Sequence, residues 1–248
     1  MRPTFSGYSG GVKIGPTFFA RKGALTDREP PRGVVDTMED LAHPGIDVTK
    51  VSPAVAAFFV DTAGLGLLIR SAWVFPISVL WSFVRPFMRL VGQFVYPTHE
   101  GRIVTRAFSI DRKRDGRSDA RAIVRTYEDG GAMQTVAYAT WERAGVRYMS
   151  AAFPLPLGQV IGILRLDPLE GGGAVLTSKK NDDDAGVWMK VGPLAIPAPF
   201  GERIALRPTT NDDICPDNIP RPTVIGEHEQ RLFGVRMVTH HYWMWPSA

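Results

Sequence analysis

Histidine is the residue in this chain whose type and position best suit proton chemistry. Three of the five histidines lie near the C-terminus, at His228, His240 and His241. A histidine ring has a pKa near neutrality, so it can act as an acid or a base under ordinary conditions. We interpret residues 227–245 as one final strand. The side chains of a strand alternate between its two faces. The odd-numbered set is more apolar and is assigned to the core, so His241 is expected to face inward and His240 outward.

The same alternation argues against a metal site. His240 and His241 are adjacent and would point to opposite faces of the strand. His228 shares a face with His240 but lies too far along a single strand to bind the same ion. We therefore expect no metal ion and no cofactor.

A predicted hairpin supplies the other candidate site residues. Residues 132–142 and 146–153 read as two strands joined at Arg143-Ala144-Gly145. Aromatic side chains here and in later strands could enclose a ligand, and nearby charged groups could orient it. The expected ligand-binding residues are Tyr138, Trp141, Arg147, Tyr148, Trp188, His228 and Trp243, and the expected catalytic residues are His241 and Glu142.

A serine, Ser9, and a cysteine, Cys215, could act as nucleophiles, but the sequence around each does not support that role. Gly7-Tyr8-Ser9-Gly10-Gly11 matches the pattern G-x-S-x-G, yet no buried strand precedes it and no helix follows it. Cys215 is the single cysteine and lies in a loop rich in Pro, Asn and Asp. It cannot form an intrachain disulfide, and we interpret it as a passive thiol.

Composition narrows the class of protein. The chain has 248 residues, 44% hydrophobic and 22% charged, which is typical of a globular protein. Its net charge of +4 is spread along the chain without a basic stripe, so we expect no nucleic-acid partner. The N-terminus lacks a charged segment followed by an apolar one, so no secretory signal is indicated. A cytoplasmic location is expected.

Two helices are predicted in the first hundred residues, and we expect both at one end of the fold. Residues 53–62 follow Ser52-Pro53, an N-cap and a proline at the first helical position. Residues 77–91 belong to the most apolar stretch, 77–95. Arginines near its middle argue against a membrane-spanning helix. Either this helix covers one end of the fold, which we favour, or it lies in a membrane interface.

From residue 101 onward, short apolar runs separated by turns predict about eight strands. We expect an α+β, mainly β protein: an antiparallel, lipocalin-like β-barrel or strongly curved sheet with two N-terminal helices. Residues 1–50 are rich in Gly, Pro and charge and are expected to form an extended arm. Residues 51–248 would form the helix-plus-β-barrel domain.

Several short segments resemble the bacterial YndJ-like uncharacterised proteins over about residues 50–245. The segments are Val51-Ser52-Pro53 with Phe58-Phe59, Ser71-Ala72-Trp73, Gly92-Gln93-Phe94 and Trp141-Glu142-Arg143. The resemblance implies a helix-plus-β-barrel architecture, somewhat lipocalin-like. It supplies no established catalytic residues.

Two functions follow as hypotheses. A barrel of this size can hold one small ligand. The first hypothesis is therefore binding of an apolar small molecule (a lipid, terpenoid or polyketide-like compound), extending to cofactor-free cyclase or isomerase activity. The alternative is a peripheral membrane-docking or scaffolding protein whose membrane contact is made by residues 77–95.

Overall fold

The computed structural model describes residues 13–178 and 184–247. The fold is mainly β, as predicted. Its strands are β1 (Leu65–Trp73), β2 (Glu100–Ser109), β3 (Arg121–Tyr127), β4 (Ala132–Arg143), β5 (Val146–Leu155), β6 (Gly158–Leu169), β7 (Gly173–Thr177), β8 (Gly186–Val191), β9 (Leu194–Pro197), β10 (Phe200–Pro208), β11 (Val224–Leu232) and β12 (Val235–Pro246). Its helices are α1 (Phe18–Arg21), α2 (Pro53–Val60), α3 (Ile77–Val91) and α4 (Arg112–Asp115), with short 3₁₀ turns η1 (Met38–Leu41), η2 (Val48–Lys50), η3 (Thr62–Gly64) and η4 (Glu170–Gly172).

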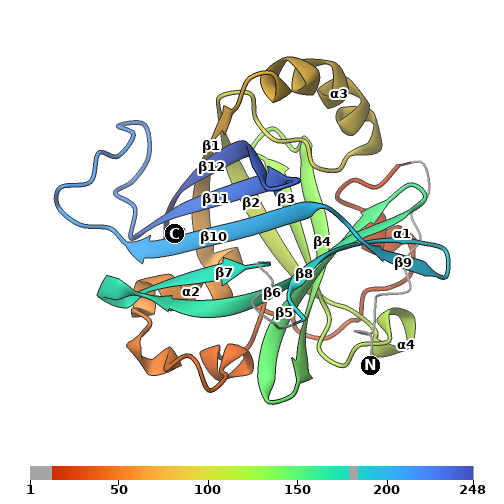
Figure 1. Ribbon diagram of the computed structural model, residues 1–248, viewed down its shortest axis with the longest axis horizontal. Helices are drawn as coiled ribbons and strands as arrows, with labels where there is room; N and C mark the ends of the chain where they lie inside the picture. The colour runs from red at the N-terminus through yellow and green to blue at the C-terminus, as the bar shows by residue number, and fades with distance from the viewer. Residues whose placement is uncertain (1–12, 179–183, 248) are drawn as a thin grey trace.

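Ten of the strands close into an antiparallel barrel (Figure 1). Their order around the barrel is β5-β4-β3-β2-β1-β12-β11-β10-β7-β6, and β6 pairs back with β5. The β8–β9 hairpin lies outside this ring and pairs with the first half of β6. The predicted antiparallel β-barrel is confirmed, with ten strands in place of about eight.

Two differences from the predicted strands lie at the C-terminal end. Residues 227–245 are not one strand but a hairpin of β11 and β12, joined at Phe233-Gly234. Both turn residues have positive φ, 50° and 80°, as a tight two-residue hairpin turn requires. In addition, β10 was not predicted. It lies between two proline-rich stretches that read as irregular chain.

In the structure, β12 points the opposite face toward the barrel interior from the one predicted. His240 and Tyr242 are buried toward the barrel interior, whereas His241 is half-buried on the outer face. The expectation that His241 faces inward is therefore wrong. The apolar odd-numbered residues misled the assignment because Trp243 is buried on the outside, where the guanidinium of Arg70 lies over its ring at 5.2 Å.

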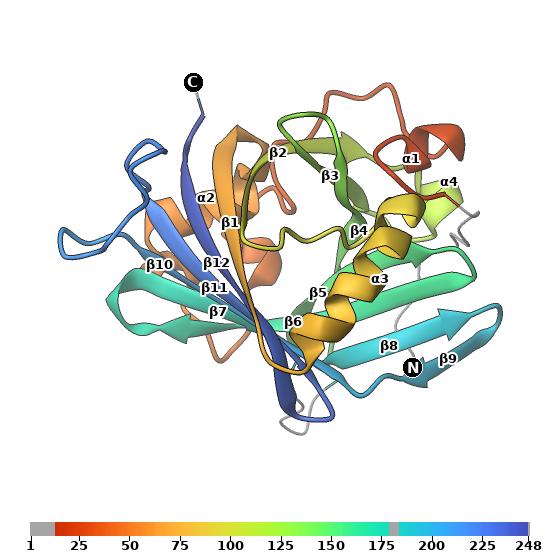
Figure 2. The same ribbon diagram turned by 90° about the horizontal axis from the view of Figure 1, so that it is seen from above.

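The two predicted helices are present but cap opposite ends of the barrel. Strand β1 starts just after α2 and ends just before α3, so its full length separates them (Figures 1 and 2). The Ser52 hydroxyl accepts a hydrogen bond from the Val55 N–H, which confirms the predicted N-cap of α2. In the part of the chain that the structure describes, no helix has the length and apolar character that crossing a membrane requires.

The segment that follows α3 crosses the barrel end and is held there by Gln93. This fully buried side chain accepts a hydrogen bond from the Thr135 N–H at 2.8 Å. It also donates to the Thr135 carbonyl at 2.8 Å and to the Pro154 carbonyl at 3.0 Å. One amide therefore joins α3 to β4 and β5.

Residues 13–50 pack against the barrel. Ile14, Phe18 and Phe19 are buried with side chains on the outer faces of β3 to β6. Val34 and Leu41 belong to the core that fills the barrel interior and its α2 end. The division into an arm and a domain stays a prediction.

The Gln93→Leu substitution tests the cross-link over the α3 end. It would leave one buried N–H and two buried carbonyls without this partner, so we expect the free energy of unfolding to fall by about 2–4 kcal/mol. Urea denaturation followed by tryptophan fluorescence measures the change. The exposed Asn218→Ala variant serves as a control and should be nearly neutral. A loss below about 1 kcal/mol for Gln93→Leu would contradict this role.

Candidate functional site

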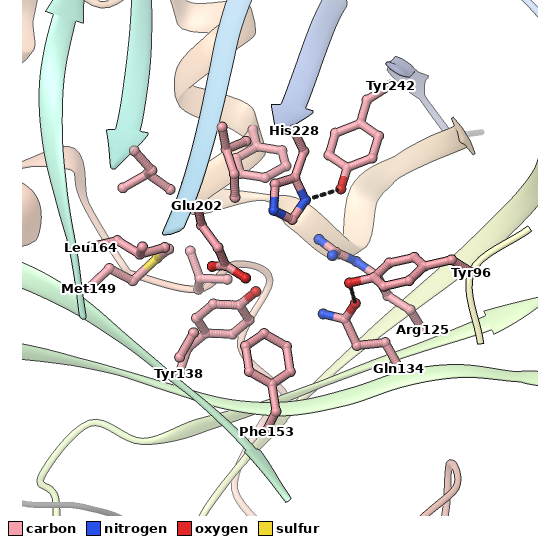
Figure 3. Close-up of a pocket in the computed structure, with 15 residues that line it drawn as sticks. Tyr96, Arg125, Gln134, Tyr138, Met149, Phe153, Leu164, Glu202, His228 and Tyr242 are labelled. Atoms are coloured by element: carbon pink, nitrogen blue, oxygen red, sulfur yellow. Dashed lines mark hydrogen bonds between the residues drawn. The ribbon is translucent and has the colours of Figure 1, made fainter. Parts of the chain in front are cut away.

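A small cavity lies inside the barrel (Figure 3). Its volume is about 30 Å³, room for roughly two water molecules. About half of its lining is apolar, including Phe153 and Leu164. The polar side chains that line it are Tyr96, Arg125, Gln134, Tyr138, Glu202, His228 and Tyr242. Such a concentration of polar groups in a barrel core makes this cavity the candidate site.

The β11–β12 hairpin supplies a neutral hydrogen-bonded pair. His228 Nδ1 lies 2.7 Å from the Tyr242 hydroxyl. Burial, followed by the charge of Arg125, lowers the pKa of His228 to about 3. Burial also raises the pKa of Tyr242 well above its usual value. Both groups are therefore uncharged near neutral pH, and His228 is a poor proton acceptor there.

His240 forms a second buried pair, behind the cavity wall. Its Nδ1 lies 2.8 Å from the Ser71 hydroxyl, and its ring stacks on Tyr96 with centroids 4.2 Å apart. Burial lowers the pKa of His240 well below its usual value. A serine beside a histidine is the arrangement of an activated nucleophile. Neither residue lines the cavity, however, so the pair positions Tyr96 and does not itself contact a ligand there.

Glu202 is the titratable group of the site. It projects from β10 into the cavity, and Gly162 leaves room for it, because a Cβ at that position would lie 3.4 Å from the Glu202 Oε2. Burial raises the pKa of Glu202 to about 7. Its carboxyl group can therefore take up and release a proton near neutrality.

A groove on the outside of the barrel meets the cavity at Glu202. β7 pairs with Arg203–Leu206 of β10, and Ser178, just beyond β7, hydrogen-bonds the backbone N–H and carbonyl of Glu202 beside the groove. The β8–β9 hairpin forms the other side of this groove, whose volume is about 620 Å³. Glu202 lines both the groove and the cavity. The two spaces thus have a common boundary.

Two of the predicted ligand-binding residues, Tyr138 and His228, line the cavity. Trp141, Tyr148 and Trp188 lie in the outer core instead. The rings of Trp141 and Tyr148 are 5.3 Å apart. The sequence pattern correctly predicted the strands that carry these aromatic residues. It did not show which face of each strand points into the barrel.

The predicted charged residues lie apart from one another. Glu142 and Arg147 form an exposed ion pair with an Nε–Oε2 distance of 3.1 Å at the rim, where Arg147 also donates to the Glu39 carbonyl. His241 and Trp243 lie on the outer face of β12, with ring centroids 6.3 Å apart. The structure does not bring His241 and Glu142 together.

Sequence analysis missed Glu202, Arg125 and Tyr96. The inward orientation of Glu202 could have been predicted from the sequence. Phe200, Ile204 and Leu206 alternate with polar or small residues, and Glu202 lies on the same face of the strand as these apolar residues. The orientation of Arg125 could not, because it depends on how the barrel closes.

The remaining candidates for chemistry are placed as follows. The hairpin sets His228 opposite His240, with ring centroids 5.6 Å apart, so the expectation that they lie too far apart along one strand is wrong. Among the described residues, no three His, Cys, Asp or Glu side chains could hold a metal ion together. Cys215 is a half-buried free thiol. Ser9 lies outside the described residues.

The Glu202→Gln substitution tests the protonation of this site. The folded-state pKa of about 7 lies above the usual 4.5, so the folded protein holds the proton more tightly. The stability contributed by this group is full below pH 4.5 and is lost as pH rises through 7. Glutamine does not titrate. We therefore expect the variant to raise the free energy of unfolding by about 1–3 kcal/mol at pH 8 and hardly at pH 4.

Urea denaturation at the two pH values makes this measurement. Glu170→Gln, on the exposed turn η4, is the control and should change neither value. Equal effects of Glu202→Gln at both pH values would show that burial does not raise the pKa of Glu202.

Comparison with known proteins gives one relative. The chain is 27% identical over 247 residues to the uncharacterized membrane protein YndJ of Bacillus subtilis (strain 168). The match covers 96% of this chain and 42% of that relative, so the chain spans less than half of its length. No family model matches the chain, and no solved structure matches it. The similarity confirms the resemblance to the YndJ-like uncharacterised proteins that the sequence segments indicated.

Proposed function

We propose that the barrel binds a small, largely apolar molecule, with its body in the groove beside β10 and its inner end in the cavity. The observation that carries this proposal is that Glu202 lines both spaces. A molecule bound in the groove would lie against Glu202, whose carboxyl group faces the polar residues of the interior.

Volume and lining support the groove as the main binding surface. Pockets for small molecules usually measure about 300–1,000 Å³, so the cavity of 30 Å³ is too small alone and the groove of 620 Å³ is in range. Val187, Pro197, Pro199 and Phe200 contribute apolar surface to the groove. A lipid, terpenoid or polyketide-like compound has the matching chemistry.

The same site offers one group for cofactor-free cyclase or isomerase chemistry. A proton-transfer residue works best when its pKa lies near the operating pH. Glu202 meets this condition at the inner end of the groove, whereas His241 and Glu142 do not reach it. The proposal needs no cofactor, and it retains the expectations of a cytoplasmic location and no nucleic-acid partner.

The Gly201→Phe substitution tests the groove. Gly201 lines it, and a Cβ there would meet only the Arg231 Cβ, at 3.9 Å, so the added ring can occupy the groove without a backbone clash. We expect the affinity for the neutral apolar dye Nile red to fall at least tenfold, measured by fluorescence titration. Leu194→Phe, on the exposed tip of the β8–β9 hairpin, should bind as the unmodified protein does. Unchanged affinity of Gly201→Phe would exclude the groove.

A second function is favoured by the outer face of α3. Val79, Leu80, Phe83, Phe87 and Leu90 are 50–77% exposed and recur at helical spacing along one side of the helix. Contiguous exposed apolar surface of this kind marks interaction sites. The named relative is a membrane protein. We therefore propose, as the alternative, peripheral membrane docking or scaffolding through this face within residues 77–95.

Vesicle co-sedimentation tests the alternative. The double variant Phe83→Asp, Phe87→Asp places charges on the exposed face and should abolish binding to vesicles that contain anionic lipid. Trp81 is unsuitable for this purpose because it stacks on Trp73 with centroids 4.3 Å apart. Ile214→Asp changes an equally exposed residue on the β10–β11 loop and should leave binding intact. Absence of binding by the unmodified protein would remove the membrane proposal.

A further inference from the structure

Three arginine side chains are buried in the described part of the chain, and they differ in their partners. Arg117, Arg121 and Arg125 are 6–8% exposed. The Arg117 Nε lies 2.5 Å from the Asp115 Oδ1. Arg121 forms an ion pair with Asp36 at 2.5 Å and donates to the Gly33 carbonyl. The Arg125 Nε has no hydrogen-bond partner, and no described carboxylate lies within ion-pair distance of its guanidinium.

An unpaired buried guanidinium is costly to the fold. It cannot escape the cost by losing its proton, because an arginine side chain stays charged in proteins. Removing a cation from water destabilises the folded state unless an anion or several hydrogen bonds compensate. Arg121 and Arg125 lie on the same face of the same strand and are both buried, but the fold places a carboxylate, that of Asp36, beside only the first.

The nearest candidate for a counterion, Glu202, lies across the barrel. In the closed ring of ten strands, β10 is five strands from β3 in either direction, so the two side chains project from opposite walls (Figure 3). The cavity lies between them. Arg125 therefore faces an enclosed space whose far wall carries Glu202, a carboxyl group that is mostly protonated below pH 7.

Several other groups around this space can donate hydrogen bonds. The Tyr138 hydroxyl lines the cavity with Arg125, and burial raises the pKa of this phenol, which keeps it protonated. Gln134 adds a side-chain amide, whose oxygen accepts a hydrogen bond from the Tyr96 hydroxyl at 3.4 Å. A guanidinium with a protonated phenol and an amide N–H forms a donor set for an anion.

We propose that Arg125 binds the carboxylate of an apolar carboxylic acid whose hydrocarbon part occupies the groove. This inference rests on the proposed function and names the ligand class for the same site. A planar carboxylate matches the two-pronged donor geometry of arginine. A cavity of about 30 Å³ with one cation favours this small, singly charged group over a phosphate.

Paired ligands test the head group. Decanoate and 1-decanol have the same chain length and differ in charge at pH 6, where Glu202 is mostly protonated. Isothermal titration should show at least tenfold tighter binding of decanoate by the unmodified protein. Arg125→Gln should remove this preference and leave the affinity for decanol unchanged. Arg121→Gln, the matched control on the same face of β3, should retain the preference.

A stability measurement separates a binding role from a structural one. Without ligand, Arg125→Gln removes an unpaired buried charge, so its Tm should equal or exceed that of the unmodified protein. Arg121→Gln leaves Asp36 without its partner and should lower the Tm. A Tm for Arg125→Gln that falls as far as that of Arg121→Gln would show that Arg125 has a structural partner, and would overturn the inference.

The ligand results also distinguish this inference from the proposed function. If decanoate and decanol bind the unmodified protein equally, the carboxylate site is wrong and the apolar groove stands. If neither ligand binds, and Nile red also fails, the proposed function falls and the inference falls with it.

Discussion

Pairing of β1 with β12 is the interaction on which the rest of the structure depends. It joins the first strand of the chain to the last and completes the ring of ten strands. Because a strand alternates its side chains, closure assigns every residue of each strand to the inside or the outside at once. The pairing sets Ser71 opposite His240 and Ile69 opposite Tyr242, so the inward orientation of His240 and Tyr242 follows from it.

The interior that results is only partly apolar. Leu164 and Phe153 line one part of the cavity, while Arg125 and Glu202 project from opposite walls. Charged and titratable groups in a barrel core oppose folding, so their presence is better explained by a ligand than by stability. The groove beside β10 borders this interior at Glu202, which lines both spaces.

On the outside of the molecule, helix α3 exposes several large apolar side chains. Helix α3 packs Trp81 against the interior core and Val91 against the outer core but leaves Phe83 and Phe87 exposed. The groove and this helix face are separate surfaces, and each carries one of the two proposed functions. A protein that both receives an apolar molecule and contacts a membrane would combine them.

Local pattern in the sequence determined the fold class, both long helices and most strands, because capping residues, turn residues and two-residue periodicity act over a few neighbours. Ser52-Pro53 and the 132–153 hairpin are examples. Only the tertiary structure decided which face of each strand is inside, because a shift of one residue or one unrecognised turn exchanges the two faces. The prediction, which took the hairpin at Phe233-Gly234 for one strand, therefore placed His241 inside, where the structure has His240. The unpaired state of Arg125 depends on strands far apart in the chain, and no local pattern encodes it.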